Sequence, residues 1–416
     1  MTLCKSLCMI RAASKEKGKM ESREKITYLD GMRGLAALVV VLSHCLYWFA
    51  PYLHSGTRYE PNPSSLEIMI VNSPVTFIYR GGSAVWLFFV LSGFVLSYGL
   101  LKRKENLAAI RAVAVKRYFR LNIPVFFAVM LGYITISLGL YKAQEFGVLN
   151  PFSLAYTKSS PDLLQALKQG IFGSIVYGET TYNYVLWTIS IELYGSFLVF
   201  SLIALFAGNV KTLRVVCVVI FFCTIHAQDK TLNSMSLFVA GILLATFKRD
   251  QLNNRAGLMA AVSLVVLGLY LMGYYPPSAS YVSLTRFAAY MRSEFGFLTN
   301  WSRLYPQIGV IVLLYSTLFT TVVLKPLGSS FFEWLGKISF SAYLMHSIVL
   351  GIVAPYVFMY FSGIQAALVA FLLVLPLTLW VSHIFYVYID NYFTVKVNKY
   401  FSVSSQESRT ALQALS

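Results

Sequence analysis

Long apolar runs separated by short polar segments dominate the chain. The runs lie near 34–53, 82–101, 122–140, 185–207, 211–227, 232–248, 257–275, 305–324, 336–357 and 365–388. Each is long enough, or nearly so, for a helix rising ~1.5 Å per residue to cross the ~30 Å hydrocarbon core of a bilayer. The pattern predicts an all-α fold, a polytopic membrane helix bundle of about ten transmembrane helices. We expect this domain over residues 28–392, between an N-terminal tail (1–27) and a C-terminal tail (393–416).

Lysine and arginine gather in every second connection and in both tails. The segment 102–120 is the richest of these connections, whereas the intervening ones hold more Pro, Gly, Asn and Tyr. By the positive-inside rule, the basic connections and both termini are expected in the cytosol, with the endoplasmic reticulum or another endomembrane as the location. Asn300-Trp301-Ser302, in an intervening connection, is an N-glycosylation sequon and agrees with this orientation.

Composition agrees that lipid is the solvent. The chain is 57% hydrophobic and 12% charged, whereas soluble domains carry about 25% charged residues. The net charge of +17 does not indicate nucleic acid, because no soluble domain is left to hold a groove. Anionic lipid headgroups or an anionic cytosolic substrate fit better. The five cysteines show no C-x-x-C pair, so we expect neither a metal site nor a disulfide framework.

Arg33 and His44 are the first candidates for chemistry. Arg33 stands at the mouth of the first apolar run, and His44 follows eleven residues later. In a helix this spacing puts the imidazole roughly 16 Å beyond the guanidinium, about half the hydrocarbon thickness. An ionisable group at that depth is costly and usually functional, and a neutral imidazole there can act as a general base. The alternative is a histidine satisfied by one polar neighbour between helices.

His346 and Glu192 are further candidates inside apolar runs. His346 lies about as far beyond the basic Lys337 as His44 lies beyond Arg33, so two histidines at matched depth in antiparallel spans could line one cavity. His346 is about as well explained as a structural hydrogen-bonding residue. Glu192 is expected near the lumenal third of its span, where a carboxylate needs a partner or a proton. It could orient a histidine or pair with an arginine.

Arg117 and Arg120 lie three residues apart at the end of the basic segment, and therefore on one helix face. Arginine pairs at a membrane mouth can fork onto phosphate oxygens, although positive-inside anchoring explains most such residues. Residues 161–176 place their leucines and isoleucines near one face. This pattern predicts either an interfacial or re-entrant helix or a helix packed on the bundle from outside the membrane.

Several segments, in order, resemble the acyltransferase 3 family of membrane O-acyltransferases. They are Asp30–Ala37 followed by His44, Phe88–Ser97, Arg117–Pro124 with the R-x-x-R pattern, Trp187–Glu192, Gly336–His346 and Tyr386–Asp390. Asp390 stands where Glu is common in the family. The chain ends soon after its last apolar run, so we expect it to lack the extra-cytoplasmic hydrolase-like domain fused to some bacterial members.

The resemblance implies an O-acyltransferase that moves an acyl group, usually acetyl, from cytosolic acyl-CoA to a hydroxyl, with no permanently bound cofactor. The expected acceptor is a small molecule, such as the secondary metabolites that similar stand-alone fungal proteins acylate, or a carbohydrate. The implied site residues are Arg33, Arg117 and Arg120 for CoA and His44, Glu192 and His346 for catalysis. Ser92, Tyr343 or a backbone N–H is expected to stabilise the oxyanion. The rival interpretation is a multi-pass transporter that uses intramembrane histidines.

Overall fold

The computed structural model describes residues 28–56, 62–103, 107–146, 160–247, 255–319 and 325–401. The predicted N-terminal tail (1–27) and most of the C-terminal tail (402–416) lie outside the described residues. Within these ranges the fold is all-helical and contains no strand, as predicted. The longer helices are the N-terminal helix Tyr28–Phe49, α4 (Gly81–Arg103), α5 (Leu107–Ser137), α8 (Trp187–Phe206), α9 (Val210–Ile225), α10 (Lys230–Thr246), α11 (Arg255–Met272), α12 (Val282–Phe295), α13 (Trp301–Phe319), α14 (Ser330–Phe358) and α15 (Gly363–Phe385).

Each of the ten predicted apolar runs coincides with a helix. Among the described residues, seven helices are long and apolar enough to cross a membrane. They include the N-terminal helix, α4, α5, α11 and α14, one that begins at Tyr184 and contains α8, and one that continues from α15 to Phe401. The other three runs form α9, α10 and the 19-residue α13. At ~1.5 Å per residue, α9 and α10 reach about 25 Å, somewhat less than the hydrocarbon core.

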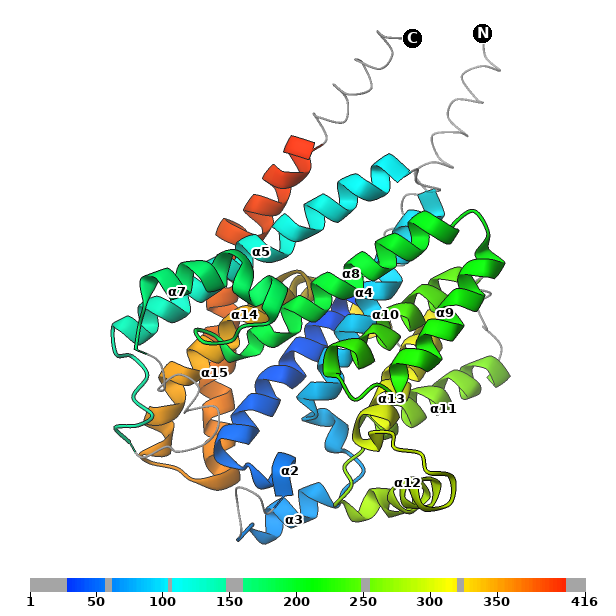
Figure 1. Cartoon of the computed structure of the whole chain (residues 1–416). Helices are drawn as coiled ribbons and strands as arrows, with labels where there is room; N and C mark the ends of the chain where they lie inside the picture. The colour runs from blue at the N-terminus through cyan, green and yellow to red at the C-terminus, as the bar shows by residue number, and fades with distance from the viewer. Residues whose placement is uncertain are drawn as a thin grey trace, which may run out of the picture.

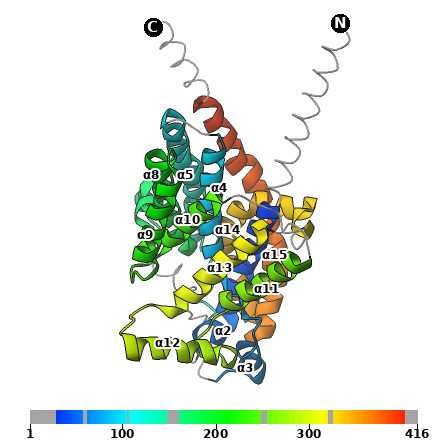
Figure 2. The same ribbon diagram turned by 90° about the vertical axis from the view of Figure 1, so that its right-hand side faces the viewer.

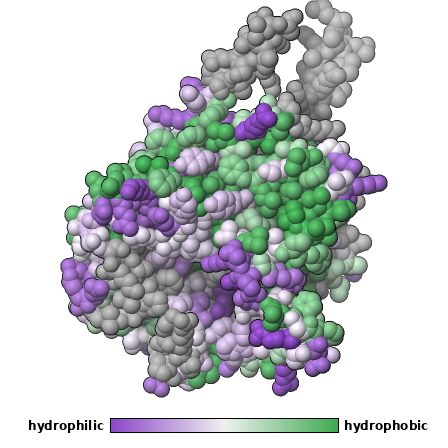
Figure 3. All heavy atoms as spheres, in the orientation of Figure 1, coloured by the Kyte–Doolittle hydropathy of each residue, from purple (hydrophilic) through white to green (hydrophobic). Residues whose placement is uncertain are grey.

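Apolar side chains cover the outside of the bundle. Val215, Val218, Val219 and Phe222 are exposed on α9, and apolar surface dominates that region in Figure 3. Hydrophilic surface gathers in the same view toward the end that holds α12. The outer helix faces therefore suit lipid contact, whereas the bundle ends suit water.

Close helix crossings depend on glycine. The N-terminal helix meets α14 where Gly34 packs against the backbone of Leu335 and Gly336, and Gly336 packs against the carbonyl of Asp30. A Cβ at either glycine would collide with the opposite backbone, so only glycine allows this approach. Ten residues further along each helix, His44 contacts His346. The two helices are therefore parallel, and the prediction of antiparallel spans was wrong because both runs begin at the same face of the bundle.

One end of the bundle is closed by short helices. The helices α2 (Tyr52–Ser55) and α3 (Ser65–Val71) lie there, and α12 lies across the same end in both ribbon views (Figures 1 and 2). Ser280 Oγ donates to the carbonyl of Asn72 at 2.6 Å and ties the start of α12 to α3. We call this the α12 end.

The predicted segment 161–176 forms α7 (Leu163–Lys168) and a following π-helical stretch, Gln169–Tyr177. Both pack against α5, and the π-helical stretch also contacts α8. Gln169 is fully buried and donates through Nε2 to Ser174 Oγ and to the carbonyl of Glu179. Leu163 and Leu164 remain exposed on the other face. One face of the segment is thus built into the bundle.

Candidate active site

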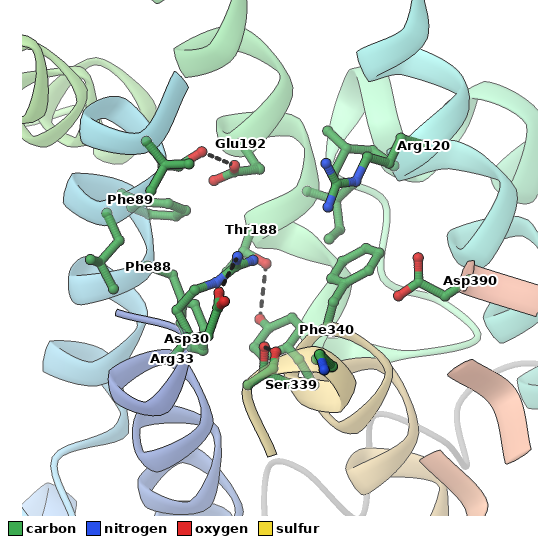
Figure 4. Close-up of a pocket in the computed structure, with 18 of the residues that line it drawn as sticks. Asp30, Arg33, Phe88, Phe89, Arg120, Thr188, Glu192, Ser339, Phe340 and Asp390 are labelled. Carbon is green, nitrogen blue, oxygen red and sulfur yellow. Dashed lines mark hydrogen bonds and ion pairs between the residues drawn. The ribbon is translucent and has the colours of Figure 1, made fainter. Parts of the chain in front are cut away.

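A pocket of about 370 Å³ lies between the N-terminal helix, α4, α5, α8, α14 and the C-terminal helix (Figure 4). This volume falls within the range of small-molecule sites, roughly 300–1,000 Å³. Its lining includes all three arginines that the sequence singled out, together with Glu192. The charged and hydroxyl side chains in the lining are Asp30, Arg33, Ser92, Arg117, Arg120, Thr188, Glu192, Lys337, Ser339, Tyr343, Tyr386, Asp390 and Thr394.

Arg33, Arg120 and Asp390 bring opposite charges together in this pocket. Arg33 Nη1 lies 3.9 Å from Asp30 Oδ1, and both side chains are about one-third exposed. Asp390 is buried, lies within the electrostatic reach of Arg120 and Arg33, and points into the same space as Arg120 in Figure 4. Arg120 is exposed. Basic side chains outnumber acidic ones by four to three in the lining, so the pocket favours an anionic ligand.

Arg117 is held deeper, by an ion pair across the bundle. Its guanidinium pairs with Glu192 Oε1, while Nε donates to Ser196 Oγ at 2.9 Å and Nη2 donates to Ser92 Oγ at 3.1 Å. Ser92 Oγ also donates to Glu192 Oε1. The Arg117 and Glu192 side chains are only 13% and 16% exposed. Of the two partners that the sequence left open for Glu192, the structure brings it to an arginine and not to a histidine.

The depth of Glu192 differs from the prediction. Asn183 Nδ2 donates to the carbonyl of Leu344 at 2.9 Å, and Ser347 Oγ donates to Asn183 Oδ1 at 2.8 Å. The segment before α8 is therefore level with His346, in the middle of the bundle. Glu192 lies further along α8, on the Arg117 side of His346. The predicted position of Glu192 near one end of the bundle was wrong, because α8 begins in the middle of the bundle and not at its surface.

His44 and His346 contact each other directly. His346 Nε2 lies 3.0 Å from His44 Nδ1, and His346 Nδ1 lies 3.1 Å from the carbonyl oxygen of Ala342. The Ala342 carbonyl can only accept, so His346 Nδ1 carries the hydrogen. In the neutral form of the pair, His346 Nε2 then accepts from His44 Nδ1–H. This arrangement leaves the lone pair of His44 on Nε2, the tautomer that a general base requires.

Tyr343 lies between the histidine pair and the pocket. It is a pocket-lining residue, and its ring centroid is 5.8 Å from that of His346. Neither histidine belongs to the lining itself, so the two do not line this cavity together. The Tyr343 hydroxyl donates to the carbonyl of Val185 at 2.7 Å and accepts from Thr188 Oγ1 at 2.9 Å. Its proton is thus committed to Val185, as that of Ser92 is to Glu192.

Sequence reasoning missed Asn183 and Thr188, the polar residues that join α8 to α14. Asn183 is fully buried and also accepts from the Val185 N–H, so one side chain both begins the helix and fixes it to α14. Its only local signal is an Asn before an apolar run, which is the usual N-cap pattern. Its contacts to Leu344 and Ser347 join residues more than 150 positions apart and leave no local trace.

A family model described as an acyltransferase domain matches residues 26–387. The chain is 25% identical over 372 residues to the protein named O-acetyltransferase PaAT-1 from Phomopsis amygdali, over 78% of this chain and 72% of that protein. No solved structure matches the chain. The matched span includes the arginines of the pocket and both members of the histidine pair.

Proposed function

The chain belongs to the acyltransferase 3 family, and on that premise we propose that it transfers an acyl group, namely acetyl, from acyl-CoA to the hydroxyl of a small molecule. The observation that carries the proposal is the histidine pair, with a base-competent Nε2 on His44, behind an arginine-rich pocket. The name of the Phomopsis amygdali relative supports acetyl as the group transferred.

We propose that the pocket takes the donor. The CoA moiety is polyanionic, and Arg33, Arg120 and Lys337 are the basic pocket residues that lie toward its exposed side. Arginine binds phosphate through charge-assisted hydrogen bonds, each contributing about 1.5–3 kcal/mol when desolvated. Arg117 is occupied by Glu192 and shapes the inner wall instead. The thioester would extend past Thr188 and Tyr343 toward the histidines.

The transfer step follows from the tautomer of the pair. The acceptor hydroxyl gives its proton to His44 Nε2 as its oxygen forms a bond to the acyl carbon. The carbon–sulfur bond then breaks, and the proton moves from His44 to the CoA sulfur. His346 orients His44 through the Nδ1 hydrogen bond. Glu192 is proposed to hold Arg117 and the α5–α8 wall, and not to exchange protons with the acceptor.

The proposal also covers the class of acceptor and the orientation of the bundle in the membrane. We propose a hydroxyl-bearing small molecule such as a secondary metabolite, with a carbohydrate as the alternative. The pocket end would face the cytosol, where acyl-CoA is made, with the α12 end in the lumen of the endoplasmic reticulum or another endomembrane. The charge bias of the connections supports this orientation.

A direct assay tests the proposal. Detergent-purified protein is incubated with labelled acetyl-CoA and small-molecule extracts from cells that lack the chain, and acetylated products are identified by mass spectrometry. Wild-type protein should bind acetyl-CoA and label products, whereas His44→Gln should bind it and label products at least about a hundredfold more slowly. His226→Gln is the matched control, because His226 bonds Thr299 away from the pair. Absence of acetyl-CoA binding, or of any labelled product, would refute the proposed function, whereas equal labelling by His44→Gln would refute His44 as its base.

A further inference from the structure

Arg80 lies immediately before α4 and does not line the arginine-rich pocket. Its guanidinium carbon is 4.0 Å from the ring centroid of Tyr275 and 5.6 Å from that of Tyr79. Both tyrosines are buried, in one cluster with Trp48 and Phe49 of the N-terminal helix. Arg80 is therefore held among aromatic rings at a fixed place in the bundle.

Two nitrogens of the Arg80 guanidinium lack hydrogen-bond partners. Its Nε and Nη2 are buried and have no hydrogen-bond partner among the described residues. Among the described residues, the titratable groups that face the guanidinium are the uncharged hydroxyls of Tyr79, Tyr275 and Tyr281 and the imidazole of His54, and none of them is a carboxylate. Arg117, by contrast, has Glu192 and two serines. Leaving a buried charged donor unsatisfied costs several kcal/mol, so a fold rarely retains one without a ligand.

The two unsatisfied atoms identify the chemistry of that ligand. Nε–H and Nη2–H lie on one edge of the planar guanidinium and point in parallel. A carboxylate accepts such a pair with its two oxygens, one hydrogen bond to each. A single hydroxyl would satisfy only one of them. The tyrosine rings stabilise the cation but supply no anion.

A backbone hydrogen bond next to Arg80 places it beside the helix that carries His44. Gly81 N–H, next to Arg80 in the chain, donates to Ser43 Oγ at 3.2 Å, and Ser43 immediately precedes His44. His54 Nε2 lies 3.5 Å from the same Ser43 oxygen. Arg80 thus lies beside the histidine helix, outside the arginine-rich pocket proposed for CoA. An acceptor must reach His44 from a direction that the donor does not fill.

We propose that Arg80 binds the carboxylate of the acceptor, which is therefore a hydroxy acid whose hydroxyl reaches His44 Nε2. This inference rests on the proposed function and narrows its acceptor class. Transfer would convert the free hydroxyl to an ester by the proton path already described, and the carboxylate would remain unchanged.

The test uses ω-hydroxy fatty acids of graded chain length, each paired with its methyl ester, which differs only in the lost charge. Two quantities are measured for every pair: the rise in melting temperature of the detergent-purified protein, and acetyl transfer from labelled acetyl-CoA. At the chain length that is used best, wild type should transfer acetyl to the acid roughly tenfold to a hundredfold more efficiently than to its methyl ester. This is the factor expected from a bidentate, charge-assisted hydrogen bond between a guanidinium and a carboxylate. Arg80→Gln should lose the preference in both measurements.

Two further variants secure the interpretation. Arg80→Lys keeps the positive charge beside Tyr275 but lacks the two parallel N–H donors. It should therefore fold and lose most of the preference for the acid. Arg292→Gln removes an exposed arginine of α12 at the same end and should keep that preference. Equal stabilisation of wild type by acid and ester at every length would overturn the role of Arg80. If acetyl-CoA binding persists in that case, only this inference fails, whereas loss of donor binding in wild type refutes the proposed function.

Discussion

His44 Nδ1 lies 3.0 Å from His346 Nε2, although 302 positions separate the two histidines in the chain. The contact depends on two parallel helices whose glycines, Gly34 and Gly336, bring the backbones together ten residues earlier. Together with the bond from His346 to Ala342, it decides which nitrogen of His44 holds the lone pair. The chemistry of one helix is therefore set by another helix from the far end of the sequence.

Replacing His44 should remove turnover and leave the protein intact. We expect His44→Gln and His44→Ala to lower kcat by about 10²–10⁴, the usual contribution of a positioned base. Acetyl-CoA affinity should stay within about twofold of wild type, because neither histidine lines the donor pocket. Labelled acetyl transfer and isothermal donor binding check this. Near-normal turnover in His44→Gln would assign the base to another residue, with His346 the next to test.

His346 should act through His44 and not independently. His346→Gln should lower kcat less than His44→Gln does, because it loses the tautomer control but leaves the base. The double variant should be no slower than His44→Gln alone, since residues that act as one unit are not additive. A complete kinetic cycle at saturating donor measures this. Multiplicative losses in the double variant would show two separate roles.

Arg117 and Arg120 should behave differently although they share a helix face. Arg117→Ala leaves Glu192 buried without its partner, which should destabilise the protein by about 3–5 kcal/mol. Arg117→Met combined with Glu192→Gln removes both charges and should restore most of the stability. Thermal unfolding in detergent checks both variants. A stable Arg117→Ala protein would mean that the ion pair contributes little to the fold.

Arg120→Ala should leave stability unchanged and weaken acetyl-CoA binding. Arg120 is exposed at the pocket, so its loss should raise the Kd roughly tenfold at low salt, and less at high salt where screening acts. Arg111→Ala, an exposed arginine of α5 outside the pocket lining, is the matched control. Unchanged donor affinity in Arg120→Ala at both salt concentrations would leave Arg120 as a topology anchor.

His54 should make stability depend on pH in acid. Burial, assisted by the positive charge of Arg80, lowers the pKa of His54 from 6.5 to about 3. Between these values the unfolded chain binds a proton that the folded chain does not, so the free energy of unfolding falls as pH drops from about 6.5 towards 3. The melting temperature of wild type should therefore fall more steeply below pH 6 than that of His54→Gln. Parallel curves would contradict the shifted pKa.

Asn300 tests the orientation of the bundle. It lies at the start of α13, next to α12 and therefore at the end proposed to be lumenal. Expression in eukaryotic membranes should give a glycosidase-sensitive mass increment that Asn300→Gln lacks. The same residue should resist protease added from the cytosolic side of sealed vesicles. Cleavage near residue 300 from that side would reverse the orientation.

The local pattern of the sequence was enough for the helices and for much of the candidate chemistry. Apolar runs predict helices because in lipid every backbone N–H and C=O must be satisfied within the segment. Arg33, Arg120 and Glu192 stood out because charge inside or beside such a run is costly. The order of short segments around these residues also indicated the family, which the match over residues 26–387 confirms.

Only the tertiary structure decided how these residues meet. The parallel crossing at Gly34 and Gly336, the pairing of Glu192 with Arg117 and the unsatisfied edge of Arg80 each depend on helices far apart in the chain. Helices in lipid are selected by close packing and a few hydrogen bonds, since apolar surface alone does not favour one neighbour over another. Local periodicity shows which side of a helix is apolar, but not which polar group lies opposite, and that partner sets the chemistry of the site.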